Sequence, residues 1–384
     1  MPWNETDAME QRCQLVMAYA SGQFEMAELC RLYGVSRPTG YKWVQRHRQQ
    51  GVLGLQPHSR APHHCPHRMP EQVARWLLAE RRAHPHWGPR KLLRRYQIAH
   101  SQAGPSRSAI ADLLRRQGLS QPSRRRRVGK RAGRRVAAVQ AANELWTIDF
   151  KGQFRMGDRR WCYPLTVMDS ASRYLLACQG ELRIQGEQVE RHMRKLFECY
   201  GLPKAIHSDN GAPFAGTGLT GLSRLSVSWL KLGIELHRSR PGCPQDNGAH
   251  ERMHRTLKAQ TARPAAANLG AQRRRFHRFR REYNQERPHE ALNDRTPSEL
   301  YCCSTRAYSK QIELSHYPGH FEVRRVRSDG SIKWRGRFLF VSQALRGELI
   351  ALEEVDEGIW SLWFMAHLLG RMDVRTMKIT YVPV

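Results

Sequence analysis

Three acidic residues in the chain have surroundings that suit metal-dependent chemistry. Asp149 lies within the apolar string LWTIDF, where an isolated charge is costly unless it is paired or bound to a metal. Asp209 ends a second predicted strand in HSDNGAPF, and the Asn-Gly pair after it predicts a sharp turn. Glu251 lies about one turn inside a predicted helix. Strand ends and a helix start can converge at one edge of a sheet, where α/β folds bind ligands.

Converging carboxylates predict a site for Mg²⁺ or Mn²⁺, because hard cations prefer oxygen ligands. Two such ions, roughly 3.5–4 Å apart, can activate an attacking oxygen and stabilise the leaving oxygen of a phosphoryl displacement. In that scheme Asp149 bridges the two ions, while Asp209 and Glu251 each complete the shell of one. No separate general base is needed, because a metal ion lowers the pKa of its bound water or hydroxyl.

The elements around these residues predict an α/β domain. Apolar runs bounded by turn signals predict strands at 145–150, 161–170, 174–180, 205–211 and 234–239. Helical patterns occur at 186–200, 224–232, 247–262 and 271–285. Three consecutive strands, followed by alternating helices and strands, indicate a mixed sheet.

The helix that carries Glu251 adds cations to the same face. Asn247, Glu251, Arg255 and Lys258 recur at i, i+4, i+8 and i+11, which is one face of a helix. A carboxylate followed by two cations suits a metal site beside a DNA backbone. A solvated helix face with ordinary Glu–Arg pairs explains the same spacing, so both interpretations stay open on this pattern alone.

Other polar residues of this domain have simpler explanations. Asp169 ends a strand and starts a turn, so we interpret it as a turn-forming or supporting residue rather than a metal ligand. Asp246 is better explained as a helix cap. Glu235 lies in an alternating strand and is a poor substitute for Glu251. His207 could orient a phosphate, but packing at the strand end is the simpler explanation.

The chain is strongly basic, with 64 Lys and Arg against 34 Asp and Glu and a formal net charge of +30. This balance is typical of proteins that neutralise phosphates. Residues 1–143 carry 26 Lys and Arg against 8 Asp and Glu, so more than half of the excess precedes Asp149. A ribosomal or membrane-surface protein would also be basic, so charge alone does not name a function.

The N-terminal segment predicts a helix-turn-helix unit. Helical patterns at 8–20 and 24–33 are followed by the turn YGVSRPT and a basic-aromatic helix that Ser36 can cap. In this layout the last helix enters the major groove of DNA. The predicted DNA contacts on that helix are Arg37, Lys42 and Arg46. The alternative is a small helical bundle without a DNA role.

A similar unit and a basic arm follow. Residues 66–120 predict three more helices, with Ser106 as the N-cap of the third. Between residues 120 and 140, eight residues are basic and none is acidic. A mobile arm of this composition binds the DNA backbone. The contacts expected from it are Arg124, Arg125, Arg126 and Arg127.

The cysteine pattern and the hydropathy indicate the cellular compartment of the protein. Nine cysteines without a CxxC pair fit a reducing cytosol better than a disulfide framework. His63, His64, Cys65 and His67 could suggest zinc, but no second ligand pair follows, so a His- and Pro-rich linker is the simpler explanation. With no signal peptide and no apolar run of about 18 residues, we expect a protein of the cytoplasm with no membrane partner.

The C-terminal residues 318–375 predict a small β-barrel. The expected strands are HFEVRRV, SIKWRG, RFLFVS, ELIALEEV and IWSLWFM, and the turns between them contain glycine. Short, evenly spaced strands of this kind are typical of small barrels. The pattern leaves open whether this domain binds DNA, binds a partner or stabilises an assembly.

Five sequence motifs occur in order across residues 144–301: LWTIDFKG, VMDSASRY, IHSDNGAPF, PGCPQDNGAHERMHRTLK and YNQERPHEALNDRTPSELY. Together they resemble the DDE-type transposases of bacterial insertion sequences, which share the catalytic core of retroviral integrases. The helix-turn-helix units and the basic arm precede them in the order expected for that family. The 41 residues between Asp209 and Glu251 form a longer interval than is common there. A surface loop tolerates such an insertion at little thermodynamic cost.

The resemblance implies a ribonuclease-H-like core whose Asp-Asp-Glu triad maps onto Asp149, Asp209 and Glu251. It implies metal-dependent cleavage at the terminal inverted repeats of a mobile element, followed by attack of the freed 3′-hydroxyl on target DNA. Arg255 and Lys258 would contact the element's end DNA. Double-stranded DNA and further copies of the chain, in a dimer or tetramer, are the implied partners. The expected segments are a helix-turn-helix domain at 1–56, a second helix-turn-helix-like domain at 66–120 and a basic linker at 121–143. They are followed by the catalytic core at 144–304 and the small β-barrel domain at 312–384.

Two other functions compete with an active transposase. A catalytically inactive regulator of the element would bind DNA through the helix-turn-helix units, but binding alone gives no reason for three carboxylates in a chain of charge +30. A plain nuclease would need little of the upstream DNA-reading segment. We therefore expect a DNA transposase.

Overall fold

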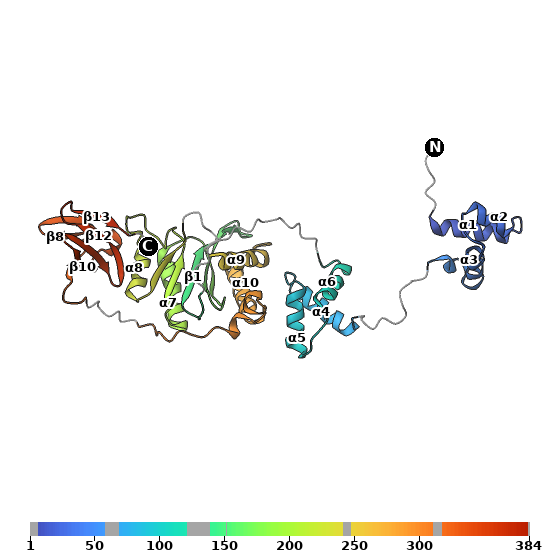
Figure 1. The fold of residues 1–384 in the computed structure, drawn as a ribbon, viewed down its shortest axis with the longest axis horizontal. Coiled ribbons are helices and arrows are strands. Elements are labelled where there is room, and N and C mark those ends of the chain that lie inside the picture. The colour runs from blue at the N-terminus through green and yellow to red at the C-terminus, as the bar shows by residue number, and fades with distance from the viewer. Residues whose placement is uncertain are drawn as a thin grey trace, which may run out of the picture. The chain divides into compact units, whose positions relative to one another are not determined.

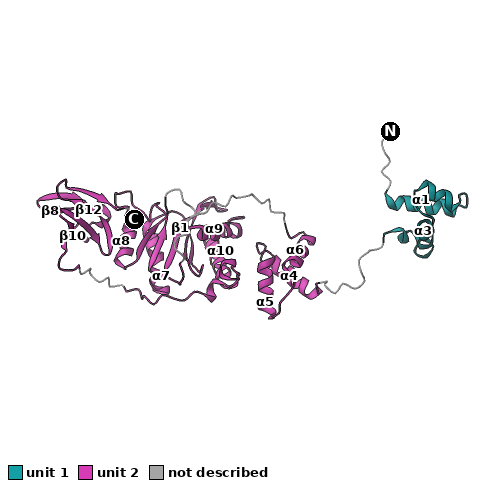
Figure 2. Ribbon diagram, in the orientation of Figure 1, with its two compact units in different colours: residues 1–68 teal, residues 69–384 magenta. Residues whose placement is uncertain are grey.

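The computed structural model describes residues 7–57, 69–120, 139–150, 152–240, 247–309 and 317–382. It divides into two compact units, residues 1–68 and 69–384 (Figure 2). The basic arm with Arg124, Arg125, Arg126 and Arg127 lies outside the described residues. So does the segment with His63, His64, Cys65 and His67.

The first unit is a bundle of three helices, as its sequence predicts. They are α1 (Ala8–Ala20), α2 (Met26–Leu32) and α3 (Arg37–Gln50), followed by a short 3-10 turn at Gly51–Leu55. Gly40 allows α3 to approach α2 closely, because a Cβ there would lie 2.6 Å from Met26 Sδ. Ser36 is the N-cap of α3, but its hydroxyl contacts the Thr39 hydroxyl at 2.9 Å instead of a backbone N–H.

A second set of three helices opens the other unit. These are α4 (Glu71–Ala83), α5 (Pro89–His100) and α6 (Arg107–Arg116). Ser106 caps α6 by accepting a hydrogen bond from the Ala109 N–H at 3.2 Å, which confirms the predicted cap. The buried side chains at their centre are Leu77, Trp87, Leu92, Tyr96, Ile110, Leu113 and Leu114.

The central domain contains the predicted mixed sheet (Figure 1). Its strands are β1 (Leu145–Phe150), β2 (Phe154–Arg155), β3 (Trp161–Asp169), β4 (Leu175–Glu181), β5 (Ala205–Ser208) and β6 (Glu235–Arg238). The order is β2-β3-β1-β5-β6, with β4 paired to β3. Strands β1, β3 and β4 pair in antiparallel fashion, whereas β5 pairs in parallel with both β1 and β6.

Helices cover both faces of this sheet. They are α7 (Gly186–Tyr200), α8 (Arg224–Lys231), α9 (Gly248–Thr261) and α10 (Leu269–Arg281). A π turn at Glu282–Glu286 extends α10, and 3-10 turns follow at Glu290–Leu292 and Pro297–Glu299.

Alternation along β1 determines which residues face which layer. Trp146 and Ile148 are buried with side chains of α7 and α8. Thr147 points to the opposite face, where it contacts α9. Asp149, two residues further along β1, therefore belongs to the face that α9 covers.

The C-terminal strands form open sheets, so the predicted closed barrel is not confirmed. The strands are β7 (Glu322–Arg325), β8 (Ser331–Trp334), β9 (Arg337–Phe340), β10 (Leu349–Asp356), β11 (Ile359–Phe364), β12 (His367–Asp373) and β13 (Lys378–Tyr381). Five of them pair in the order β13-β12-β11-β10-β7, and β8 pairs with β9. Closure is unnecessary for burial, because Val227 and Leu230 of α8 share this core with Ile350 and Leu362. Lys231 also pairs with Glu348 at 2.9 Å.

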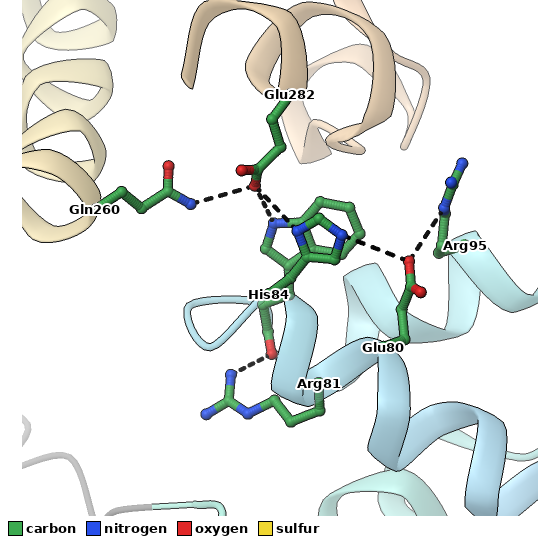
Figure 3. Close-up of polar contacts among 7 residues, drawn as sticks. Glu80, Arg81, His84, Arg95, Gln260 and Glu282 are labelled. Carbon is green, nitrogen blue, oxygen red and sulfur yellow. Dashed lines mark hydrogen bonds and ion pairs between the residues drawn. The ribbon is translucent and has the colours of Figure 1, made fainter. Parts of the chain in front are cut away.

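Within the second unit, the α4–α6 helices contact the end of α10 through one carboxylate (Figure 3). Glu282 accepts hydrogen bonds from the indole N–H of Trp87 at 3.2 Å and from the Gln260 amide at 3.3 Å. His84 Nδ1 lies 3.3 Å from the same oxygen. Nearby, Arg90 of α5 reaches Asp294 at 2.9 Å and Glu290 at 2.5 Å.

None of the helices in the described ranges has both the length and the apolar character needed to cross a bilayer.

Candidate active site and nucleic-acid interface

The register of two parallel strands brings Asp149 and Asp209 to the same edge of the sheet. Thr147 of β1 pairs with His207 of β5. Continuing that register by two residues sets Asp149 opposite Asp209, which directly follows the last residue of β5. Neighbouring strands lie about 4.8 Å apart and side chains alternate between faces, so both carboxylates belong to one face. The paired residues end at Thr147 and His207, so the convergence of the two carboxylates themselves stays a prediction.

Two histidines of α9 hold that helix against β1 and β3. His250 bridges two hydroxyls, with Nδ1 2.7 Å from Thr147 Oγ1 and Nε2 2.7 Å from Thr166 Oγ1. His254 Nε2 also lies 2.7 Å from Thr166 Oγ1. The histidines are only 0% and 3% exposed. Thr166 has a single hydroxyl proton, so at least one of the two rings donates an N–H to it.

The same cluster reaches Asp149. Thr166 is the register partner of Asp149, and its hydroxyl lies 3.2 Å from the Asp149 carbonyl oxygen. His254 Nδ1 lies 3.8 Å from Asp149 Oδ2. The Asp149 side chain is 13% exposed, so its charge is held in a mostly buried place beside the His254 imidazole.

Glu251 follows His250 directly, in the first turn of α9. The contacts of His250 with β1 and β3 therefore position the helical turn that carries this carboxylate. Within the described ranges, no three His, Cys, Asp or Glu side chains are gathered closely enough to hold a metal ion. Metal binding by Asp149, Asp209 and Glu251 stays a prediction.

A half-buried cation lies beside Asp209. Arg238 of β6 donates to the Phe214 carbonyl at 2.7 Å and to the Asp209 carbonyl at 3.4 Å. It also contacts the Ser208 hydroxyl. Burial lowers the pKa of Arg238 to about 10, against the opposing effect of the Asp209 charge. A guanidinium held here adds positive charge beside Asp209.

Asp169 is a turn-forming residue, as predicted. Its Oδ1 accepts the Asn143 N–H at 2.8 Å, while Oδ2 accepts the Ser172 N–H and hydroxyl at 2.8 and 2.6 Å. Burial raises the pKa of Asp169, and these hydrogen bonds oppose that rise. His207 is buried and contacts the Ser239 hydroxyl at 2.9 Å, in agreement with packing at the strand end.

The two cations predicted on α9 are exposed. Arg255 points away from the buried face of the helix. Lys258 crosses the backbone at Gly152, where a Cβ would overlap its side chain. Gly152 is three residues beyond Asp149, so Lys258 lies over the chain that follows β1. The solvated-face alternative and the DNA-contact interpretation both remain compatible with this exposure.

In the first unit, the predicted DNA-binding helix places its cations around an aromatic ring. The guanidinium carbons of Arg12 and Arg46 lie 4.2 and 5.1 Å from the centre of the Trp43 ring, and Lys42 Nζ lies 5.4 Å from it. Arg37 and Lys42 are exposed. Cation–π contacts orient a cation without neutralising it, so these charges stay available to phosphates.

The sequence interpretation missed His250, His254 and the contact of α4–α6 with Glu282. A signal for the histidines existed. His250, Met253, His254 and Leu257 recur at i, i+3, i+4 and i+7, which is the pattern of a buried helix face. No local signal could have identified Glu282, because its partners His84 and Trp87 are about 200 residues away in the chain.

Profiles of known families match the N-terminal helices, the central domain and the C-terminal strands. Integrase core domain profiles match residues 139–244 and 232–297. A helix-turn-helix domain matches residues 11–63, and a homeodomain-like domain matches 39–114. The profile of the IS481 family transposase C-terminal domain matches residues 321–380.

Two curated relatives come from insertion elements. "Insertion element IS407 uncharacterized 31.7 kDa protein" of Burkholderia multivorans (strain ATCC 17616 / 249) is 30% identical over 201 residues, covering 50% of this chain and 67% of the relative. "Insertion element IS476 uncharacterized 39.2 kDa protein" of Xanthomonas euvesicatoria is 26% identical over 200 residues, covering 52% of this chain and 55% of the relative. Among solved structures, the catalytic core domain of BIV integrase is similar with a TM-score of 0.32 and 23% identity, covering 41% of this chain and 93% of that one. A TM-score of 0.32 is too low to establish a shared fold.

Proposed function

Because the chain belongs to the family of insertion-sequence transposases with an integrase core domain, we propose that it cuts DNA at the ends of a mobile element and joins them to target DNA. The reaction depends on Mg²⁺ or Mn²⁺ held by Asp149, Asp209 and Glu251. The observation that supports this proposal is the pairing of Thr147 with His207 across β1 and β5, two residues before Asp149 and Asp209, beside the α9 turn that bears Glu251.

The donor set suits hard divalent cations. Asp149 and Asp209 supply carboxylate oxygens from one sheet edge, and Glu251 supplies a third carboxylate from the first turn of α9. Asp149 has the central position, because its strand pairs with β5 and also faces α9, so we assign it to bridge two ions. When bound, the ions would activate the attacking oxygen and stabilise the leaving oxygen.

The protein's own side chains position the reactants around that centre. His250 and His254 fix α9 against β1 and β3, so the separation of Glu251 from Asp149 is set by buried contacts. Arg255 and Lys258 contact the backbone of the element's end DNA. Each such contact displaces condensed counterions and makes binding sensitive to salt.

Sequence recognition belongs to the N-terminal helices. Helix α3, with Arg37, Lys42 and Arg46, enters the major groove of the terminal inverted repeat. Arg124, Arg125, Arg126 and Arg127 of the arm bind backbone phosphates nearby. Two element ends must be joined in one reaction, so we propose that the chain acts as a dimer or tetramer on DNA.

Strand transfer by the purified full chain tests this function. Repeat DNA from the element's ends and a target plasmid are incubated with Mg²⁺ or Mn²⁺, and joined products are counted. Asp149→Asn is expected to reduce joining by about 1,000-fold, because it removes several kcal/mol of metal-based stabilisation. Glu198→Gln removes an exposed carboxylate of α7 in the same domain and is the matched control.

The outcomes separate the candidate functions. Joining that persists in Asp149→Asn contradicts the assignment of the site. Wild-type protein that binds the repeat but neither cuts nor joins it is a regulator of the element instead. Wild-type protein that cuts without joining is a nuclease.

A further inference from the structure

A cavity of about 880 Å³ lies within the second unit, bounded by α5, by α9 and by the segment after α10. Its floor includes Thr147 and His207, which precede Asp149 and Asp209 by two residues on the same strand face. Two residues of a strand span about 7 Å, or about two nucleotide steps along a DNA strand. The cavity therefore opens beside the proposed reaction centre without being part of the carboxylate set.

The charges that line the cavity do not balance. Five cationic side chains face two acidic ones. Both acids, Glu290 and Asp294, are paired with Arg90. The cations left to the cavity are Lys91, Arg173, Arg252 and Arg287.

One of these cations is buried with an unused donor. Arg287 is 8% exposed, and its Nη1 has no hydrogen-bond partner among the described residues. A buried N–H without a partner is destabilising, and more so when the group is charged. Native proteins rarely carry such a group without a reason, and an anion in the cavity would supply the missing acceptor.

The ionisation behaviour of the lining agrees with a missing anion. Burial, and after it the charge of Arg287, lowers the pKa of Lys91 to about 8. Burial likewise lowers the pKa of His289 to about 3, assisted by Arg287, Lys91 and Arg173. These cations repel one another in a partly dry space.

Two helix N-termini also meet the cavity. Gly88 and Pro89 begin α5, and Asn247 and Gly248 begin α9. Within the described residues, neither terminus is capped by a side-chain hydrogen bond. Uncapped helix N-termini present free N–H groups and a positive partial charge, which together favour phosphate.

We propose that this cavity is a phosphate-binding site, which holds either a backbone phosphodiester of a nucleic acid strand or a free phosphate ester. In the first case it deepens the proposed function by anchoring a strand about two nucleotides from the reacting phosphodiester. In the second case it is an independent anion site.

Two single variants of the full chain test the cavity, Lys91→Met and Arg252→Gln. Arg278→Gln is the control, because it removes an exposed arginine of α10 that does not line the cavity. Arg287 is left intact, since truncating a buried arginine can unfold the chain. Thermal midpoints without added anion verify folding. They are expected to be unchanged or higher in the Lys91 variant, which removes a repelling buried cation.

The first measurement is the thermal midpoint in sodium phosphate against sodium chloride at equal ionic strength. Phosphate is expected to raise the midpoint of wild type and Arg278→Gln, but not of the cavity variants. The second is the affinity for a fluorescein-labelled DNA duplex across a range of salt. If the ligand is a strand, each cavity variant binds about tenfold more weakly and its salt slope falls by about one.

Each result has one meaning. Lost phosphate stabilisation together with weaker DNA binding assigns the site to a strand. Lost phosphate stabilisation with DNA binding equal to that of Arg278→Gln assigns it to a free phosphate. Equal behaviour of all four proteins in both assays overturns the proposal. Asp149→Asn is expected to keep the phosphate response, so failure of strand transfer and failure of this site are separate observations.

Discussion

The two three-helix segments, residues 7–57 and 69–120, are both basic, but they use their cations differently. In the first, Arg12, Lys42 and Arg46 gather around the ring of Trp43. An aromatic face orients these cations and leaves their charge available. The first segment therefore has a positively charged surface that is suited to binding phosphates.

In the second segment, cations of α5 are already engaged with carboxylates. Arg90 pairs with Asp294 and Glu290, and Arg94 donates to the Asp294 carbonyl at 3.3 Å. His84, at the end of α4, contacts Glu282. A helix rich in cations can thus be used for docking where acids are supplied from elsewhere in the chain, as in α5, and we propose that α3 uses its cations for recognition.

The largest effect is expected when the positive charge of α3 is removed. The triple variant Arg37→Ala, Lys42→Ala, Arg46→Ala is expected to bind the inverted repeat at least about 100-fold more weakly, because removing each side chain costs about 1 kcal/mol or more of binding free energy. Its salt slope is expected to fall by about three, one for each phosphate that the variant no longer neutralises. Fluorescence anisotropy with repeat DNA at several salt concentrations measures both quantities.

A matched triple variant on α10 is the control for net charge. Arg274→Ala, Arg275→Ala, Arg278→Ala removes the same charge from a helix of the central domain. Equal decreases in affinity in the two triple variants would mean that recognition follows net charge alone, and the special role of α3 would have to be abandoned.

Much of the central domain could be predicted because its signals are local. The strand patterns at 145–150, 161–170 and 205–211 correspond to β1, β3 and β5 within a few residues. The parallel pairing of β1 with β5, which leads toward Asp149 and Asp209, is of the kind that an α/β alternation implies. The metal-binding role of these residues stays a prediction.

The parts that could not be predicted depend on long-range pairing. Whether the C-terminal strands close into a barrel depends on which edges meet, and α8 covers part of their core instead. His250 and His254 are polar residues on a buried face, where polarity alone suggests exposure. The partner of Glu282 lies in another helix bundle, so a sequence pattern presents it as one more surface acid.

A smaller effect is expected from pH at the docking contact. The pKa of His84 is raised, chiefly by its hydrogen bond to Glu282. Burial acts to raise the pKa of Glu282, but the hydrogen bond and charge of His84 bring it below its ordinary value. The His84 contribution is therefore complete below pH 6.5 and is lost as pH rises through its raised pKa. The Glu282 contribution is lost only in acid, as pH falls through its lowered pKa.

Hydrogen–deuterium exchange of residues 80–95 in the full chain measures the docking. Corrected for intrinsic rates, exchange is expected to be about fivefold faster at pH 8 than at pH 6, corresponding to about 1 kcal/mol for one charge-assisted hydrogen bond. Glu80, Glu286 and Arg95 surround the same contact and remain in place. Glu282→Gln is expected to flatten the pH dependence, whereas Glu71→Gln, on the exposed side of α4, keeps it. An unchanged profile in Glu282→Gln would assign the docking to other contacts.

The smallest effect is expected from Arg90, although it makes the most ion pairs across this contact. Its partners Asp294 and Glu290 also lie near Lys91, so a second cation remains close to both carboxylates when the guanidinium is removed. Part-exposed ion pairs are further weakened by water and salt. Arg90→Gln is therefore expected to speed exchange of residues 80–95 by only about twofold, against no change in Arg75→Gln, whose pair with Glu71 is fully on the surface. A change as large as that of Glu282→Gln would show that the ion pairs of Arg90 hold the second segment as firmly as the Glu282 contact does.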